Sequence, residues 1–192
     1  MASAQPSFLL SVRPPAELAA RVERFRRAQG VRDAAAIPHI TVKARSGLTP
    51  DLEWLGVARA VVAGTPPIAA EIGGARLFRH GAALYLVVRS PDAVRLHMAL
   101  LAALKPPQRF GYEGPQMTPH LSLALARRGV DLGEVGLAAR TEFADLDAEP
   151  LVFTARTVTL MKKPGPGGFY APVEEWLLGG AAYGEGEHLP VS

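Results

Sequence analysis

The sequence predicts a single α+β domain whose β-structure is antiparallel or mixed. Two observations support this prediction. Predicted helices and strands follow one another without strict βαβ alternation, and a five-residue segment occurs once in each half of the 192-residue chain. Because no linker or change in composition separates the halves, we expect one domain of two similar lobes over residues 1–178. A flexible tail is expected over residues 179–192.

The first half of the chain predicts a strand, a helix, a strand, a helix and a strand. Leu18, Val22 and Phe25 recur at helical spacing, and Gly30 ends that helix. Thr49-Pro50-Asp51 combines a capping hydroxyl, a first-turn proline and an acid that suits the helix dipole, so a second helix is expected to begin there. The five expected elements span residues 8–12, 15–29, 39–44, 49–62 and 68–78.

The second half continues with a strand that pairs with residues 68–78 around a turn at His80-Gly81. Ser90-Pro91-Asp92 repeats the capping signal, and Lys105-Pro106-Pro107 ends the helix that it opens. A Pro/Gly loop over residues 164–168 precedes the last strand. The expected elements span residues 83–88, 90–104, 120–126, 132–143, 151–161 and 173–178.

The composition is that of a soluble globular protein, with 48% hydrophobic and 20% charged residues. The absence of cysteine excludes disulfides, zinc–thiolate sites and thiol nucleophiles. The first residues lack a basic signal-peptide region, and no apolar run approaches the ~20 residues that span a bilayer. We therefore expect a cytoplasmic protein with no membrane contact. A net charge of +3 would attract anions weakly, but equally fits scattered surface arginines.

The repeated segment reads Pro38-His39-Ile40-Thr41-Val42 in the first half and Pro119-His120-Leu121-Ser122-Leu123 in the second. In a strand, side chains two residues apart point to the same face, so each copy presents an imidazole beside a hydroxyl while its aliphatic residues face a core. The prolines fix the entry of the chain and remove a ladder donor, which favours strands that begin at the edge of a cleft.

Two imidazoles that titrate near neutrality can divide the cleavage of a phosphate ester between them. One accepts a proton from the attacking water and the other donates a proton to the leaving oxygen. The two hydroxyls can donate hydrogen bonds to the non-bridging phosphate oxygens. His39, Thr41, His120 and Ser122 are therefore the candidate catalytic residues. No metal and no other cofactor is required by this chemistry.

Three other interpretations of the repeat remain open. A single His-x-Thr in a strand is more often incidental than catalytic, although its recurrence argues against coincidence. A metal site would need a third ligand, and neither motif contains an acidic residue. The site could also bind phosphorylated RNA ends or nucleotides with little turnover.

The paired His-hydrophobic-Thr/Ser-hydrophobic motifs resemble those of the 2H phosphoesterase superfamily, the LigT-like or 2′-5′ RNA ligase group. The resemblance covers roughly residues 8–178 and implies a bilobal α+β fold with pseudo-twofold symmetry, outer helices and a central cleft lined by both motifs. It also implies metal-independent hydrolysis of 2′,3′-cyclic phosphates at RNA ends or on nucleotides. Lys43-Ala44-Arg45 follows the first motif where LigT enzymes usually have Phe-Leu-Gly, which is closer to the YjcG-like branch.

We expect His120 to activate water and His39 to protonate the leaving ribose oxygen, but the near-symmetric motifs allow these two roles to be exchanged. Run backwards, the same geometry could join RNA ends as a 2′-5′ ligase. An RNA end or a small nucleotide is the expected partner. No obligate protein partner is required, and a monomer is the default.

Four more residues are candidates for substrate binding. Lys43 continues the alternation of His39 and Thr41, so its ammonium could reach the cleft, although a solvated lysine at a strand end fits equally well. Lys162, Phe169 and Tyr170 flank the Pro/Gly loop, where an aromatic ring beside a basic side chain could stack on a base. An ordinary hairpin connection is the favoured alternative for this loop.

Overall fold

The computed structural model describes residues 5–31, 37–44 and 46–180 and contains one eight-stranded antiparallel sheet. The strand order is β6-β3-β4-β5-β2-β1-β7-β8. The strands are β1 (Ser7–Val12), β2 (Ile40–Lys43), β3 (Ile68–Leu77), β4 (Ala83–Arg89), β5 (His120–Leu125), β6 (Leu151–Ala155), β7 (Thr157–Lys163) and β8 (Ala171–Leu177). The helices are α1 (Ala16–Ala28), α2 (Leu55–Ala63), α3 (Pro91–Leu104), α4 (Leu132–Glu142) and α5 (Asp145–Ala148).

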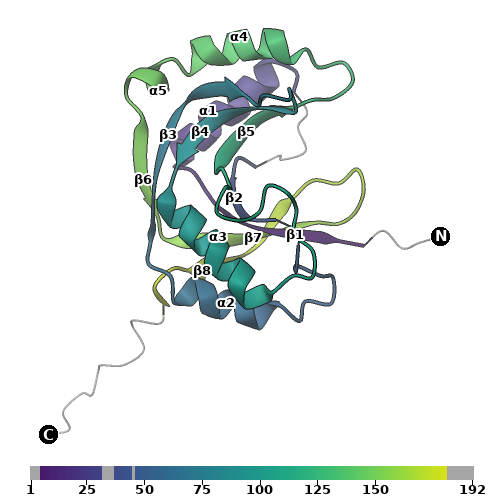
Figure 1. The fold of residues 1–192 in the computed structure, drawn as a ribbon. Coiled ribbons are helices and arrows are strands. Elements are labelled where there is room, and N and C mark those ends of the chain that lie inside the picture. The colour runs from purple at the N-terminus through teal and green to yellow at the C-terminus, as the bar shows by residue number, and fades with distance from the viewer. Residues whose placement is uncertain (1–4, 32–36, 45, 181–192) are drawn as a thin grey trace, which may run out of the picture.

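The sheet consists of two four-stranded halves that meet where β5 lies beside β2 (Figure 1). Helices α1 and α4 cover the half that contains β3, β4 and β5, and α2 and α3 cover the other half (Figure 1). Two of these helices cross between the halves, because α1 follows β1 but contacts β5, and α3 follows β4 but contacts β2. The predicted bilobal α+β fold is confirmed, with the two lobes joined in one sheet.

The two strands that carry the histidine motifs, β2 and β5, are here called the motif strands, and both have the same local irregularity. Opposite β1, the register shifts between the pairs Ser11–Thr41 and Leu10–Lys43, so Val42 is an extra residue on β2. Opposite β4, it shifts in the same way between Tyr85–Ser122 and Leu84–Ala124. Each motif strand therefore has a β-bulge directly after its hydroxyl residue, and such a bulge disrupts the ladder and bends the strand.

The core lies between the sheet and its helices. On β1, the buried side chains of Phe8, Leu10 and Val12 point to the helix-covered side, as the alternation of a strand requires. On α1, Leu18 and Val22 are buried and belong to the same core. The core therefore holds the motif strands from behind and leaves their other face for the site.

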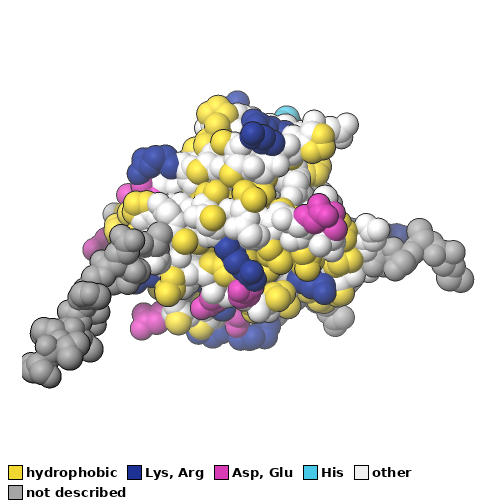
Figure 2. All heavy atoms as spheres, turned by 90° about the horizontal axis from the view of Figure 1, so that it is seen from below, with side chains coloured by type: hydrophobic (Ala, Val, Ile, Leu, Met, Phe, Trp, Pro, Cys, Tyr) yellow, Lys and Arg dark blue, Asp and Glu magenta, His cyan; other side chains and the backbone are white. Residues whose placement is uncertain are grey.

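Several arginines on the surface form ion pairs with acidic side chains. On the face seen in Figure 2, basic and acidic side chains are interspersed among hydrophobic ones. Arg59 of α2 forms an ion pair with Glu174 of β8, and Arg21 of α1 pairs with Asp145 of α5. These pairs agree with the interpretation of the arginines as scattered surface charges.

The predicted strand over residues 151–161 is wrong in one respect, because it is two strands. The alternation is continuous in sequence, but β6 pairs with β3 at one edge of the sheet and β7 pairs with β1 in the other half. Arg156 separates the two strands. Hydrophobic alternation reports which face a residue occupies and says nothing about its partner strand, so it misses this crossing.

The second predicted helix begins later than expected, at Leu55 instead of residue 49. Leu52 has a positive φ of 66°, which a right-handed helix does not accommodate. The Asp51 carboxylate accepts hydrogen bonds from Thr49 and from the backbone N–H of Glu53, forming a turn ahead of the helix. By contrast, Ser90 caps α3 as predicted, accepting a hydrogen bond from the N–H of Ala93 at 3.1 Å.

Most of the expected C-terminal tail, from residue 181, lies outside the described residues. Within the described part of the chain, every helix is too short or too polar to cross a bilayer.

Candidate active site

The two motif histidines have the same backbone anchor. Nδ1 of His39 lies 2.8 Å from the carbonyl oxygen of Ile37, and Nδ1 of His120 lies 2.9 Å from that of Thr118. A carbonyl oxygen only accepts, so Nδ1 donates in both rings. In the neutral ring this leaves the lone pair on Nε2, on the side away from the anchor, where it can accept a proton.

The pairing of β2 with β5 sets the relative positions of the two motifs. The strands are antiparallel and Ile40 lies opposite Leu121. Continuing this register by one residue places His39 opposite Ser122 and Thr41 opposite His120, all on one face of the sheet. Each imidazole therefore faces the hydroxyl of the other motif, as a twofold axis through the Ile40–Leu121 pair requires.

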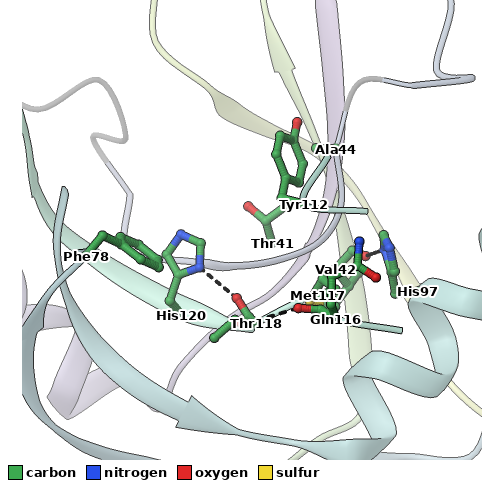
Figure 3. Close-up of a pocket in the computed structure, with 10 residues that line it drawn as sticks. All are labelled: Thr41, Val42, Ala44, Phe78, His97, Tyr112, Gln116, Met117, Thr118 and His120. Atoms are coloured by element: carbon green, nitrogen blue, oxygen red, sulfur yellow. Dashed lines mark hydrogen bonds between the residues drawn. The ribbon is translucent and has the colours of Figure 1, made fainter. Parts of the chain in front are cut away.

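A cavity of about 390 Å³ opens over the Thr41–His120 pair and is lined by both residues (Figure 3). His39 and Ser122 belong to the same face but are not among the residues that line this cavity. The remaining lining residues come from β2 and the residue after it, the residue after β3, α3 and the connection before β5. They are Val42, Ala44, Phe78, His97, Tyr112, Gln116, Met117 and Thr118.

Aromatic rings hold His120 in place. The ring of Phe78 meets the His120 ring edge-on at 5.1 Å, and the ring of Tyr85 does so at 5.7 Å. Phe78 and Tyr85 stack on each other at 4.1 Å. Such edge-to-face contacts restrict the orientation of the imidazole. With its anchor to Thr118, His120 therefore has a fixed ring plane at the wall of the cavity.

His39 is in a different electrostatic environment. Burial lowers the pKa of His39 below its ordinary value of 6.5 and outweighs the opposing effect of the Ile37 carbonyl. The positive charges of Arg26 and His120 lower this pKa further. His39 is therefore mainly neutral at neutral pH.

Side chains from α1 and α3, the two helices that cross between the halves, form hydrogen bonds with backbone carbonyl oxygens at the bulges. Arg26 of α1 donates from Nη2 to the carbonyl oxygen of Ser122 at 2.5 Å and from Nε to that of Leu123 at 3.3 Å. His97 of α3 contacts the carbonyl oxygen of Val42 through Nδ1 at 2.8 Å. Each helix therefore stabilises the irregular part of a motif strand in the half to which it crosses.

The prediction that the Lys43 ammonium reaches the cleft is wrong. The bulge at Val42 resets the alternation, so Lys43 pairs with Leu10, whose side chain lies in the core. Lys43 is fully buried, and its Nζ lies 2.7 Å from Oε1 of Glu113 and also donates to Ser46. An ammonium with these partners is a structural cation and not a phosphate ligand.

The other three predicted binding residues lie outside the cavity lining. Lys162 is exposed on β7, and Phe169 is 46% exposed after the Pro/Gly loop. The Tyr170 hydroxyl forms a hydrogen bond with the Ser7 hydroxyl at 3.0 Å, which ties the end of this loop to β1. The structure therefore groups the four motif residues but does not bring these three residues to the same cavity.

Several residues of the site were missed by sequence reasoning. Arg26 lies four residues after Val22 on the apolar stripe of α1, and a cation in that position was a usable signal of a buried partner. Phe78 and Tyr112 lie in connections, where an aromatic residue has no periodicity to reveal its role. His97 is buried on α3 and also lines the cavity, and nothing in the spacing of the helix distinguishes it from a packing residue.

Within the described ranges, no group of three His, Cys, Asp or Glu side chains is placed to hold a metal ion.

A family model described as the 2′-5′ RNA ligase superfamily matches residues 14–167. Among solved structures, TT0787 of Thermus thermophilus is similar with a TM-score of 0.58 and 20% identity, over 91% of this chain and 98% of that one. LigT of E. coli complexed with phosphate gives a TM-score of 0.56 and 18% identity, over 92% and 99%. LigT complexed with 3′-AMP gives 0.56 and 18%, over 90% and 98%. At these identities the likeness is one of fold.

No curated protein matches the sequence. The narrower resemblance to the YjcG-like branch stays a prediction. Because the family match spans most of the chain and includes both histidine motifs, this protein belongs to the 2′-5′ RNA ligase superfamily, the 2H phosphoesterases that its motifs resemble.

Proposed function

We propose that this protein hydrolyses 2′,3′-cyclic phosphates, at RNA ends or on nucleotides, by acid–base catalysis between His39 and His120 and without a metal ion. The observation that supports this proposal most directly is the crossed arrangement of the motifs. Each histidine is anchored through Nδ1, has its Nε2 directed away from the anchor, and lies opposite the hydroxyl of the other motif. A phosphate group between them would meet two proton carriers and two hydrogen-bond donors.

The environments of the histidines favour His39 as the base, which is the exchange of the roles first expected from the sequence. Neutral His39 accepts a proton from water through Nε2, and the water oxygen bonds to phosphorus. The bond from phosphorus to one ribose oxygen breaks, and protonated His120 donates its Nε2 proton to that oxygen. The product is a ribose 2′- or 3′-monophosphate. The lowered pKa of His39, caused first by burial, suits the role of base near neutral pH.

Thr41 and Ser122 would bind the non-bridging oxygens of the phosphate. Both residues are partly exposed, and they lie on the strand face that holds both imidazoles. Donors fixed on strands need little reorganisation as negative charge develops, which is the condition under which hydrogen bonds favour a transition state. E. coli LigT has been crystallised with phosphate and with 3′-AMP, and these complexes support a nucleotide phosphate as the ligand class.

Ligation is a second candidate, because the family description names 2′-5′ RNA ligation. In that reaction a ribose 5′-hydroxyl takes the place of water: its oxygen bonds to phosphorus as His39 accepts its proton, and the bond from phosphorus to the 3′-oxygen breaks as His120 donates a proton to that oxygen. Both reactions use one site, so substitutions in the motifs would abolish both.

The test uses the full chain with adenosine 2′,3′-cyclic phosphate, assayed with and without EDTA. We expect turnover that survives chelation, is lost in His39→Ala, and is retained in His80→Ala, a control that removes an exposed histidine outside the site. Loss of turnover with EDTA and its restoration by a divalent ion would contradict the metal-free mechanism. Tight nucleotide binding without turnover would instead identify a binding module.

A further inference from the structure

The connection that leads into the second motif forms one wall of the cavity. Residues 110–118, here called the entry segment, contribute Tyr112, Gln116, Met117 and Thr118 to the lining. The segment has its own internal bonds, since Glu113 N–H donates to the Phe110 carbonyl at 2.9 Å and Met117 N–H donates to that of Gly114 at 3.0 Å. The wall is therefore an ordered part of the site.

A buried ion pair fastens this segment to the first motif strand. Lys43 Nζ lies 2.7 Å from Glu113 Oε1, and both side chains are fully buried. Glu113 also accepts hydrogen bonds from the Ser46 hydroxyl at 2.7 Å and the Phe110 N–H at 2.8 Å. Burial alone would raise the pKa of Glu113, but these hydrogen bonds outweigh it and lower this pKa, so the carboxylate is ionised.

His97 adds a second fastening between the same two parts. Its Nε2 accepts a hydrogen bond from the Gly114 N–H at 3.0 Å, so Nδ1 must carry the proton and donate to the Val42 carbonyl at 2.8 Å. The neutral ring thus bridges the bulge beside Thr41 to the residue after Glu113. The entry segment is therefore held to β2 through two adjacent residues, Glu113 and Gly114.

A gain in folding stability is a poor explanation for the buried Lys43–Glu113 ion pair. Replacing a buried ion pair by apolar residues of similar volume is often neutral or stabilising, because both charges lose their hydration on burial. What the pair does provide is a defined position, because a fully hydrogen-bonded buried network permits one geometry. The part so positioned bears Tyr112, which lines the cavity, is 53% exposed and has its ring stacked with that of Phe110 at 5.3 Å.

We propose that the entry segment is the wall that binds the nucleoside attached to the reacting phosphate, with Tyr112 as the ring on which the base stacks. Lys43, Glu113 and His97 are then positioning residues that hold this wall against β2. The inference rests on the proposed function and assigns the part of the site that selects a nucleoside over a bare phosphate ester. In Figure 3, Tyr112 lies apart from Phe78 and His120, beyond Thr41, which leaves a base within reach of the ring while the phosphate lies at the motifs.

The test compares adenosine 2′,3′-cyclic phosphate with glycerol 1,2-cyclic phosphate, a cyclic ester without a base. For Tyr112→Ala we expect the KM of the nucleotide to rise by roughly tenfold, the scale of one base–aromatic stack, while its kcat stays within about twofold. The KM of the glycerol ester should not change. Phe169→Ala is the matched control, since it removes a similarly exposed ring outside the cavity. An unchanged nucleotide KM in Tyr112→Ala would overturn the stacking assignment.

The positioning role is tested with the double substitution Lys43→Met/Glu113→Met, which removes both buried charges together. We expect a folded protein with a raised nucleotide KM and an unchanged KM for the glycerol ester. An equal loss for both substrates, or no change in a folded variant, would contradict the positioning role. If this variant does not fold, His97→Leu, which removes both hydrogen bonds of the second fastening, replaces it, and an unchanged nucleotide KM there is again contradictory.

Binding separates this inference from the proposed function. If the wild-type protein turned over neither ester, the proposed function would fail, but calorimetric titration with 3′-AMP would still decide the inference. Weaker 3′-AMP binding in Tyr112→Ala than in Phe169→Ala supports the wall, and equal affinities overturn it.

Discussion

At the scale of single residues, His39 and His120 share an anchor but differ in their surroundings. Both use Nδ1 to contact a backbone carbonyl two residues earlier. Burial and the charge of Arg26 lower the pKa of His39, whereas His120 lies at the cavity beside two aromatic rings. A near-symmetric pair can thus divide the roles of base and acid, because the environment and not the motif distinguishes the two rings.

This difference predicts the pH dependence of kcat/KM. The base must be neutral, so activity falls as the pH drops through the pKa of His39, and burial and Arg26 place this acid limb below pH 6.5. Arg26→Gln removes a positive charge that lowers the pKa, so the limb should move to higher pH. Arg24→Gln, an exposed residue of the same helix, serves as the control and should leave the limb unchanged. A limb that does not move in Arg26→Gln would argue against His39 as the base.

Residue-level prediction from the sequence worked where the strand was regular and failed at the bulge. Alternation correctly placed Thr41 on the face of His39 and Ser122 on that of His120. The same rule assigned Lys43 to the cleft, but the extra residue Val42 turns it to the core. A bulge depends on the partner strand, so no pattern within residues 38–44 announces it.

At the scale of elements, α3 is joined to the sheet through its cap. The Ser90 hydroxyl accepts a hydrogen bond from the Ala93 N–H and donates to the Ala69 carbonyl of β3 at 2.7 Å. The helix so fixed bears His97, which reaches the first motif strand. The Ser90 cap therefore fixes the start of α3, and α3 in turn holds His97 beside the first motif strand.

Ser90→Ala should lower the free energy of unfolding by about 1–2 kcal/mol, because it removes a helix cap and a buried hydrogen bond. Urea denaturation measures this change. Thr141→Ala, which removes an exposed hydroxyl from α4, should change it by no more than about 0.5 kcal/mol. Equal effects of the two substitutions would show that the Ser90 cap has no special role.

The sequence correctly predicted which segments are helices and which are strands, but it predicted some of their first and last residues less accurately. The capping signal at Ser90 identified α3, yet the same signal at Thr49 preceded a turn, because Leu52 adopts a left-handed conformation. The single strand expected over residues 151–161 became β6 and β7 because their partners lie in different halves. These limits depend on tertiary contacts, which local periodicity does not contain.

At the scale of the whole molecule, both halves of the sheet contribute residues to the candidate site. The motif strands meet at the centre of one sheet, and each receives a side chain from a helix that begins in the other half. The recurrence of the motif predicted two facing lobes. The register of β2 against β5 and the crossing of the helices are contacts between distant segments, so they had to come from the structure.

Two histidines with lowered pKa values also make the fold sensitive to acid. Burial is the main cause of the lowered pKa of both His39 and His97. Well above pH 6.5 both rings are neutral in the folded and unfolded chains. Below it the unfolded chain binds protons more readily, so stability should fall as the pH drops from about 6.5 through the folded pKa values. Urea midpoints at about pH 7.5 and about pH 5.5 measure this, and His97→Gln should reduce the difference. Equal midpoints in the wild-type protein would contradict the account.

The most direct test of the two-histidine mechanism is a double-mutant cycle on kcat for adenosine 2′,3′-cyclic phosphate in EDTA-treated protein. His39→Ala and His120→Ala should each lower kcat by roughly 10²–10⁴-fold, the range for a general acid or base. The double substitution should lower it little further, because the two rings act on one proton-transfer sequence. Independent losses that multiply in the double variant, or a single variant that keeps most of its activity, would contradict a mechanism in which both histidines act together.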